Sequence, residues 1–293
     1  MPKYFLIVPL AAGLTLASCG GNSKSEDEVA NADSLKTEAL PAQVTETIFQ
    51  VPSPGEMLTF IKMVGGKNNK NISFLNSTEN QKKYTDSKSK ALNFGIYVCD
   101  LSYCSTFEIG AEALKYIKTV KQLGDQIGVS SAIKPELLKR LEGNLNNSDS
   151  LAVITDDLYF SSFETLETGK QGQTLSLVVA GGWIESLFIA TNLSKYEDKS
   201  PIVERLADQK YTLDNLVEFL KKYESDADVA SVLKQFTELQ SEFNKIGEKE
   251  VETSTSKNKK VLGGGKELVI TEAQYKSLVE KIKSVRNSYT QIK

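Results

Sequence analysis

Two segments of the chain, 91–107 and 175–193, are apolar around nearly their whole circumference when they are drawn as helices. An amphipathic helix can cover a protein surface, but a helix without a polar face has to be surrounded by other elements. Each segment contains glycine and a single carboxylate. The two segments therefore predict a multi-helix bundle that is built around a central pair of helices.

The rest of the body shows the three- and four-residue spacing of apolar side chains that is typical of amphipathic helices. Such helices are expected from Pro54, over 88–127 with a break near 105–110, from Pro135, over 150–167, 213–223 and 229–246, and from Thr271 to the end. Asn76 is expected to cap a short helix through Tyr84. The pattern predicts an all-α fold.

We divide the body into a helical domain over 51–247, a polar linker or hairpin over 248–270, and a C-terminal helix over 271–293. Within the middle part, a small hairpin is expected near 261–270, around the run Gly263–Gly265.

The carboxylates of the central segments, Asp100 and Glu185, are the candidate site, because an ionised carboxylate on an apolar helix is costly unless it finds a partner or water. In one interpretation they line a central pocket, with Tyr103 and Trp183 nearby, and hold a polar ligand. In the other, each accepts hydrogen bonds from buried donors and orders the core, which is the interpretation we favour. Gly181 and its neighbour Gly182 are expected to permit close helix packing.

Cys99 and Cys104 are expected to be buried free thiols. If both lie on one helix, five residues apart, their Cα atoms are roughly 8 Å apart, which exceeds the bridging limit of about 7 Å.

The amino terminus has the features of a bacterial lipoprotein precursor. Lys3 precedes an apolar run over 5–17, which is too short to span a bilayer but is typical of a signal peptide. The run ends in Leu-Ala-Ser-Cys at 16–19, which resembles a lipobox. We therefore expect cleavage after residue 18 and acylation of Cys19, with palmitate-type chains that anchor the protein to a membrane.

Residues 19–50 are expected to form a lipidated flexible tether, because they are rich in small and polar residues and poor in aromatic ones. Aspartate, the inner-membrane retention signal, does not follow Cys19, which favours the outer membrane. The acidic cluster 26–28 resembles a surface-export signal, so the periplasmic face and the cell surface both remain open. Ser34 lies in a short sequence that resembles an O-glycosylation acceptor.

Composition excludes several functions. The chain has 35 basic and 38 acidic residues, so it lacks the basic excess of a nucleic-acid-binding protein. It has no histidine, which removes histidine-based catalysis and nearly all catalytic zinc sites. We expect no metal and no cofactor, and an enzyme is the least favoured class.

The segments 91–101 and 180–185 resemble a family of uncharacterised Bacteroidetes-type lipoproteins, and a weaker resemblance extends over most of 50–245. The resemblance implies a helical body behind a lipid anchor and carries no known activity. We expect a non-catalytic binding or interaction protein of the cell envelope that works with envelope protein partners. The alternative is a binder of a small polar ligand at Asp100 and Glu185.

Overall fold

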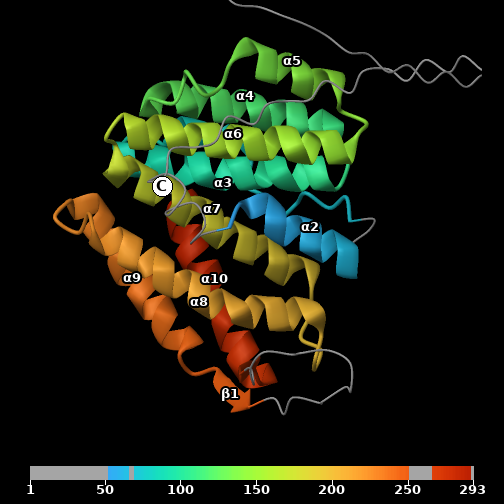
Figure 1. The fold of residues 1–293 in the computed structure, drawn as a ribbon, viewed down its shortest axis with the longest axis vertical. Coiled ribbons are helices and arrows are strands. Elements are labelled where there is room, and N and C mark those ends of the chain that lie inside the picture. The colour runs from blue at the N-terminus through green and yellow to red at the C-terminus, as the bar shows by residue number, and fades with distance from the viewer. Residues whose placement is uncertain (1–51, 66–68, 251–265, 292–293) are drawn as a thin grey trace, which may run out of the picture. The chain divides into compact units, whose positions relative to one another are not determined.

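A computed structural model describes residues 52–65, 69–250 and 266–291 of the chain (Figure 1). All of them belong to one compact unit that spans 40–293. The predicted signal peptide, the predicted acylation site Cys19, the predicted tether and Ser34 lie outside the described residues.

The body is an all-α bundle, as the sequence predicts. Its helices are α2 (Pro54–Val64), the short 3-10 helix η1 (Thr78–Lys83), α3 (Ser87–Thr106), α4 (Gly110–Ile127), α5 (Pro135–Gly143), α6 (Ser148–Thr168), α7 (Gly172–Leu193), α8 (Pro201–Lys221), α9 (Ala227–Phe243) and α10 (Glu272–Thr290). The expected break between the helices of 88–127 is confirmed, because α3 ends at Thr106 and α4 begins at Gly110.

The two all-apolar segments form α3 and α7, and these helices make the most extensive contact in the bundle. In Figure 1, α4 and α6 lie with α3 on one side of α7, and α8, α9 and α10 lie on the other. The helix α2 contacts both α3 and α7. The central pair is thereby covered by neighbours on its whole circumference, which explains why neither helix needs a polar face.

Glycines allow α3 and α7 to cross at close range. A Cβ atom on Gly95 would lie 2.0 Å from the carbonyl oxygen of Val178, and one on Gly181 would lie 2.0 Å from that of Leu92. No side chain fits at either position without separating the helices. The expectation that Gly181 serves helix packing is therefore confirmed, and Gly95 has the same role on the partner helix.

The central helix α7 is also long and apolar enough, by length and composition alone, to cross a membrane. However, 89% of its most apolar window is buried inside the protein. In this bundle α7 is therefore a core helix.

Local signals set the helix ends. The Ser53 hydroxyl accepts the backbone N–H of Glu56 at the start of α2, where Pro54 occupies the first turn. Thr271 and Gln274 form a reciprocal capping box at the start of α10. The sequence led us to expect that Asn76 caps η1, but it does not. Ser77 does so, and Asn76 is buried with its side chain turned into the core.

The hairpin also differs from the expectation. Strand β2 (Lys266–Val269) lies in the expected range, but it pairs antiparallel with β1 (Gly247–Glu250), with Gly247 opposite Val269. The first strand therefore begins at the last residue of the expected helical domain and continues into the segment that the sequence assigned to a polar linker or hairpin, and the run Gly263–Gly265 lies outside the described residues. All four residues of β1 are exposed. The segment therefore lacks the alternation of apolar and polar side chains that would have predicted a strand.

Candidate functional site

The two central carboxylates meet in the core of the bundle. Asp100 on α3 and Glu185 on α7 both have an exposed fraction of 0%, and their carboxyl groups lie near enough for the charge of Glu185 to raise the pKa of Asp100. The side chains of Asp100 and Glu185 can approach each other because the backbones of α3 and α7 cross at close range. The expectation that both residues are central is confirmed.

The partner of Glu185 is Arg286, which the sequence analysis missed. Its Nε donates to Oε2 of Glu185 over 2.8 Å and its Nη2 donates to Oε1 over 3.0 Å, so the ion pair is bidentate. The guanidinium also stacks on Phe188, with Cζ 4.4 Å from the ring centroid. The sequence did indicate that Arg286 is buried, because it lies four residues after Ile282 and three before Tyr289, on the apolar stripe of α10.

Asp100 is held differently. Its Oδ2 accepts the backbone N–H of Asn76 over 3.3 Å, whereas its Oδ1 has no donor among the described residues. Burial, and then the charge of Glu185, raise the pKa of Asp100 well above its ordinary value, although Arg286 acts in the opposite direction. We therefore expect Asp100 to hold a proton, which would give the unpaired Oδ1 a hydrogen to donate.

Arg286 stays charged beside this pair. Burial alone would lower its pKa, but the Glu185 carboxylate outweighs burial and raises it. With Asp100 neutral, one negative and one positive charge remain. The polar cluster of Asp100, Glu185 and Arg286 is thus electrically neutral as a whole, which is the state that a buried site tolerates best.

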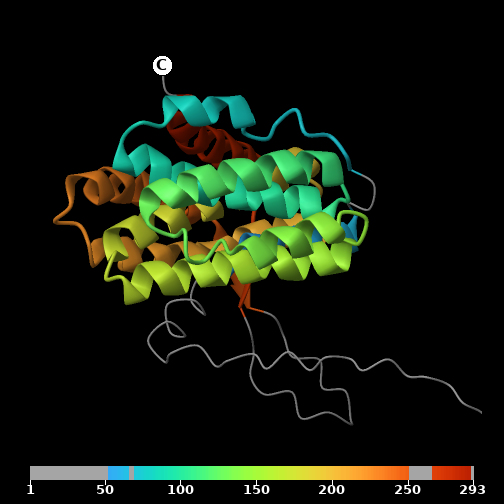
Figure 2. The same ribbon diagram turned by 90° about the horizontal axis from the view of Figure 1, so that it is seen from above.

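A layer of amides and hydroxyls connects this cluster to the end of α10. The Asn76 side chain donates to Asn93 over 3.1 Å and to the Tyr84 hydroxyl over 3.0 Å. Asn93 in turn donates to the carbonyl of Tyr289, and Tyr84 donates to that of Thr290. Through these bonds η1 lies next to the end of α10 (Figure 2). The carbonyls at the end of α10 are thereby paired, as a buried helix end requires.

Tyr103 and Trp183 are not part of this cluster. The Tyr103 hydroxyl donates to the carbonyl of Asn71 over 2.9 Å, and the Trp183 indole donates to Gln209 over 3.1 Å. Both side chains belong to other parts of the core. Cys99 and Cys104 are buried free thiols, as expected.

A cavity borders the cluster through Arg286 and not through either carboxylate. It has a volume of about 350 Å³ and lies between α10, the segment 73–80 and Phe188 of α7. Lys283, Asn287 and Gln291 also line it. Ligand pockets are commonly about 300–1,000 Å³, so this one suits a small molecule. We call it the α10 cavity.

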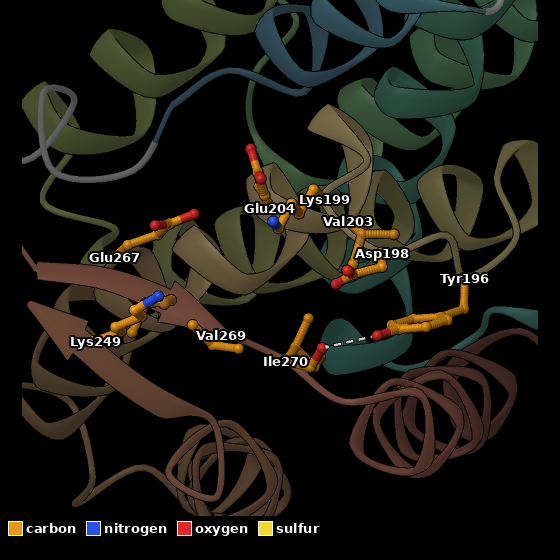
Figure 3. Close-up of a pocket in the computed structure, with 10 residues that line it drawn as sticks. Tyr196, Asp198, Lys199, Val203, Glu204, Lys249, Glu267, Val269 and Ile270 are labelled. Atoms are coloured by element: carbon orange, nitrogen blue, oxygen red, sulfur yellow. Dashed lines mark hydrogen bonds between the residues drawn. The ribbon is translucent and has the colours of Figure 1, made fainter. Parts of the chain in front are cut away.

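A second cavity, of about 140 Å³, lies where β2 and α8 meet (Figure 3). The Tyr196 hydroxyl donates to the carbonyl of Ile270 over 3.3 Å at one side of it. Its charged lining has both signs, with Lys249 and Lys199 beside Glu267 and Glu204. Because of its small volume and mixed charge, it is a poorer candidate than the α10 cavity.

In the described part of the chain, no group of three acidic or cysteine side chains is arranged to hold a metal ion. Comparisons of the chain with models of protein families, with curated proteins and with solved structures give no significant match.

Proposed function

We propose that the chain is a lipid-anchored lipoprotein of the outer membrane whose helical body is a non-catalytic binding module. The observation that carries the binding part is the α10 cavity. Its wall contains amides, hydroxyls and two cationic side chains, and no carboxylate or cysteine. With no histidine in the chain, these groups offer hydrogen bonds and charge to a bound molecule but no nucleophile with an adjacent base.

The anchor rests on the amino terminus. Leu16, Ala17 and Ser18 lead into Cys19 directly after a short apolar run. The resemblance of 91–101 and 180–185 to Bacteroidetes-type lipoproteins supports the same assignment. The residue after Cys19 is glycine, which favours the outer membrane over retention in the inner one.

The binding module has two candidate binding partners. The helical faces could receive an envelope protein partner, or the body could hold a small polar ligand. For the second candidate, a ligand that touches Asp100 and Glu185 directly is disfavoured, because both are fully buried and the α10 cavity does not reach them. We place the ligand instead on the outer edge of Arg286, which Glu185 holds in position.

The anchor is tested by expressing the full chain in a bacterium that processes lipoproteins and labelling it with a palmitate analogue. We expect the label and membrane sedimentation in the wild type, and the loss of both in Cys19→Ala. The matched control is Cys104→Ala, which removes a buried thiol and should keep the label. A label that survives Cys19→Ala would contradict the proposal. Protease treatment of intact cells then separates the cell surface from the periplasmic face.

A further inference from the structure

The α10 cavity has a charge pattern that is unusual for this chain. The sequence as a whole has a net charge of −3, yet the wall of this cavity contains Lys283 and Arg286 and no acidic side chain. Among the described residues, Lys283 has no carboxylate partner, unlike Lys276 and Lys281 of the same helix, which pair with Glu272 and Glu238. An unpaired lysine at a cavity is available to an anionic group.

Arg286 adds a donor from the buried side. Of its five N–H groups, four have acceptors among the described residues: two bind Glu185, one the Thr290 hydroxyl and one the carbonyl of Phe74. The remaining N–H is on Nη1. The side chain is 7% exposed, and Arg286 lines the cavity. Its position is fixed by the bidentate pair and by Phe188, so this donor is pre-organised.

The net charge of the wall sets the charge of the occupant. Arg286 is neutralised by Glu185, and Asp100 behind it holds a proton, so Lys283 leaves the site with one net positive charge. A carboxylate carries one negative charge and matches this site. A phosphate monoester carries nearly two, and phosphate sites usually present several cations or a helix N-terminus.

The other residues of the cavity wall favour a ligand that carries hydroxyl groups. The side chains of Ser73, Asn287 and Gln291 line the cavity and have no hydrogen-bond partner among the described residues. Phe74 and Phe188 supply apolar surface. Amide and hydroxyl groups beside aromatic rings suit a molecule with hydroxyls on its edges and C–H groups on its faces.

From this arrangement we infer that the α10 cavity binds a small hydroxylated carboxylate of the sugar-acid class, with its carboxylate at Lys283 and the free N–H of Arg286. The inference deepens the binding part of the proposed function and does not depend on the lipid anchor. It assigns Lys283 as the residue that selects an acid over the corresponding neutral sugar.

The test uses the full chain, purified in detergent, with D-glucuronate and D-glucose as probes in calorimetry or ligand-observed NMR. We expect saturable binding of glucuronate that is at least about tenfold tighter than that of glucose, because the carboxylate adds a charge-assisted hydrogen bond that the neutral sugar cannot make. Lys283→Gln should abolish this preference. The control Lys276→Gln changes an exposed lysine on the same helix that does not line the cavity, and it should bind as the wild type does.

Equal binding of the two probes, binding of neither, or an unchanged preference in Lys283→Gln would each overturn the inference. Lys283 is exposed, so its substitution should leave the fold intact, and a thermal unfolding curve checks this. The outcome is separable from that of the anchor experiment: a labelled protein that does not bind glucuronate refutes only this inference. An unlabelled protein that binds it refutes only the anchor.

Discussion

At the scale of single residues, the buried polar cluster depends on one proton. Asp100 is fully buried beside Glu185, and only one of the two can be ionised without strong repulsion. Because Glu185 has the ion pair with Arg286 and burial raises the pKa of Asp100, we place the proton on Asp100. The two carboxylates therefore have different roles despite their similar positions on α3 and α7.

The exchange Asp100→Asn should accordingly be tolerated. The amide can donate to Glu185 and its oxygen can accept the N–H of Asn76, as the protonated acid does. We expect the free energy of unfolding at pH 7 to change by less than about 1 kcal/mol, the size of one ordinary hydrogen bond. The measurement is denaturant unfolding.

The comparison variant is Glu185→Gln, which leaves Arg286 as an unpaired buried charge. Loss of one partner of a buried ion pair costs about 3–5 kcal/mol. If Asp100→Asn were as damaging as Glu185→Gln, Asp100 would be ionised in the folded protein and the assignment of the proton would be wrong.

Asp156 on α6 makes a second prediction, about pH. Burial raises its pKa to about 6, although the Ser53 hydroxyl donates to it over 3.1 Å. The unfolded value is about 3.9, so between pH 4 and 6 the folded chain binds more protons at this site than the unfolded chain. This group therefore makes the protein less stable as pH rises through that window.

In Asp156→Asn this contribution is absent. The unfolding free energy of the variant relative to the wild type should rise between about pH 4 and pH 6 and then stay constant. Chemical denaturation at a series of pH values measures the difference. If the unfolding free energies of the wild type and the variant changed in parallel over this pH range, Asp156 would have the same pKa in the folded and unfolded chains, and the prediction would be wrong.

At the scale of elements, the crossing of α3 and α7 controls the architecture. Gly181→Ala would place a methyl group 2.0 Å from the carbonyl oxygen of Leu92, and Gly95→Ala would do the same at Val178. Because backbone atoms cannot yield as a flexible side chain can, the helices must separate. We expect each variant to lose at least about 1–3 kcal/mol, measured as a fall in the unfolding free energy.

The control is Gly143→Ala in α5, where a Cβ atom would meet nothing within 4 Å. Alanine favours helix over glycine by roughly 0.5–1 kcal/mol, so this variant should be unchanged or slightly more stable. A similar loss at all three glycines would mean that close approach is not the reason for glycine at the crossing.

The helices themselves could be predicted from local patterns, because capping residues, prolines and apolar stripes act within a few residues. The all-apolar character of α3 and α7 also predicted that they are central. The position of β1 could not be predicted, since Gly247–Glu250 is exposed and its strand character arises only from pairing with β2.

The candidate site was predictable only in part. Burial of Asp100 and Glu185 followed from their apolar neighbours, but their mutual contact required the geometry of the crossing. Arg286 is 101 residues from Glu185, and one sequence contains no signal for a pair at that distance. The sequence also did not show that Tyr103 and Trp183 take their hydrogen-bond partners outside the cluster, because those partners, Asn71 and Gln209, lie far away in the chain.

At the scale of the whole molecule, α10 is an integral part of the body and not an appended helix. It packs on α7, α9 and α3, and its residues Tyr275, Ile282 and Val285 are buried. It also supplies Arg286. Deletion of residues 251–293 should therefore leave an apolar face and a buried Glu185 without its counter-ion.

We expect the shortened chain to lose cooperative thermal unfolding and to be cleaved rapidly by proteases. Arg286→Met in the full chain separates the two causes, because it keeps the apolar packing and removes only the ion pair. A shortened chain that unfolds as cooperatively as the full one, at the same temperature, would contradict this account of α10.

The central claim is that the binding body is held at a membrane through Cys19. The most direct measurement is the mass of the mature protein, extracted with detergent from its membrane, together with that of its N-terminal peptide. The account predicts a chain that begins at Cys19 and carries a diacylglyceryl group and N-terminal acylation. A mature chain that begins elsewhere, or an unmodified cysteine, would contradict it.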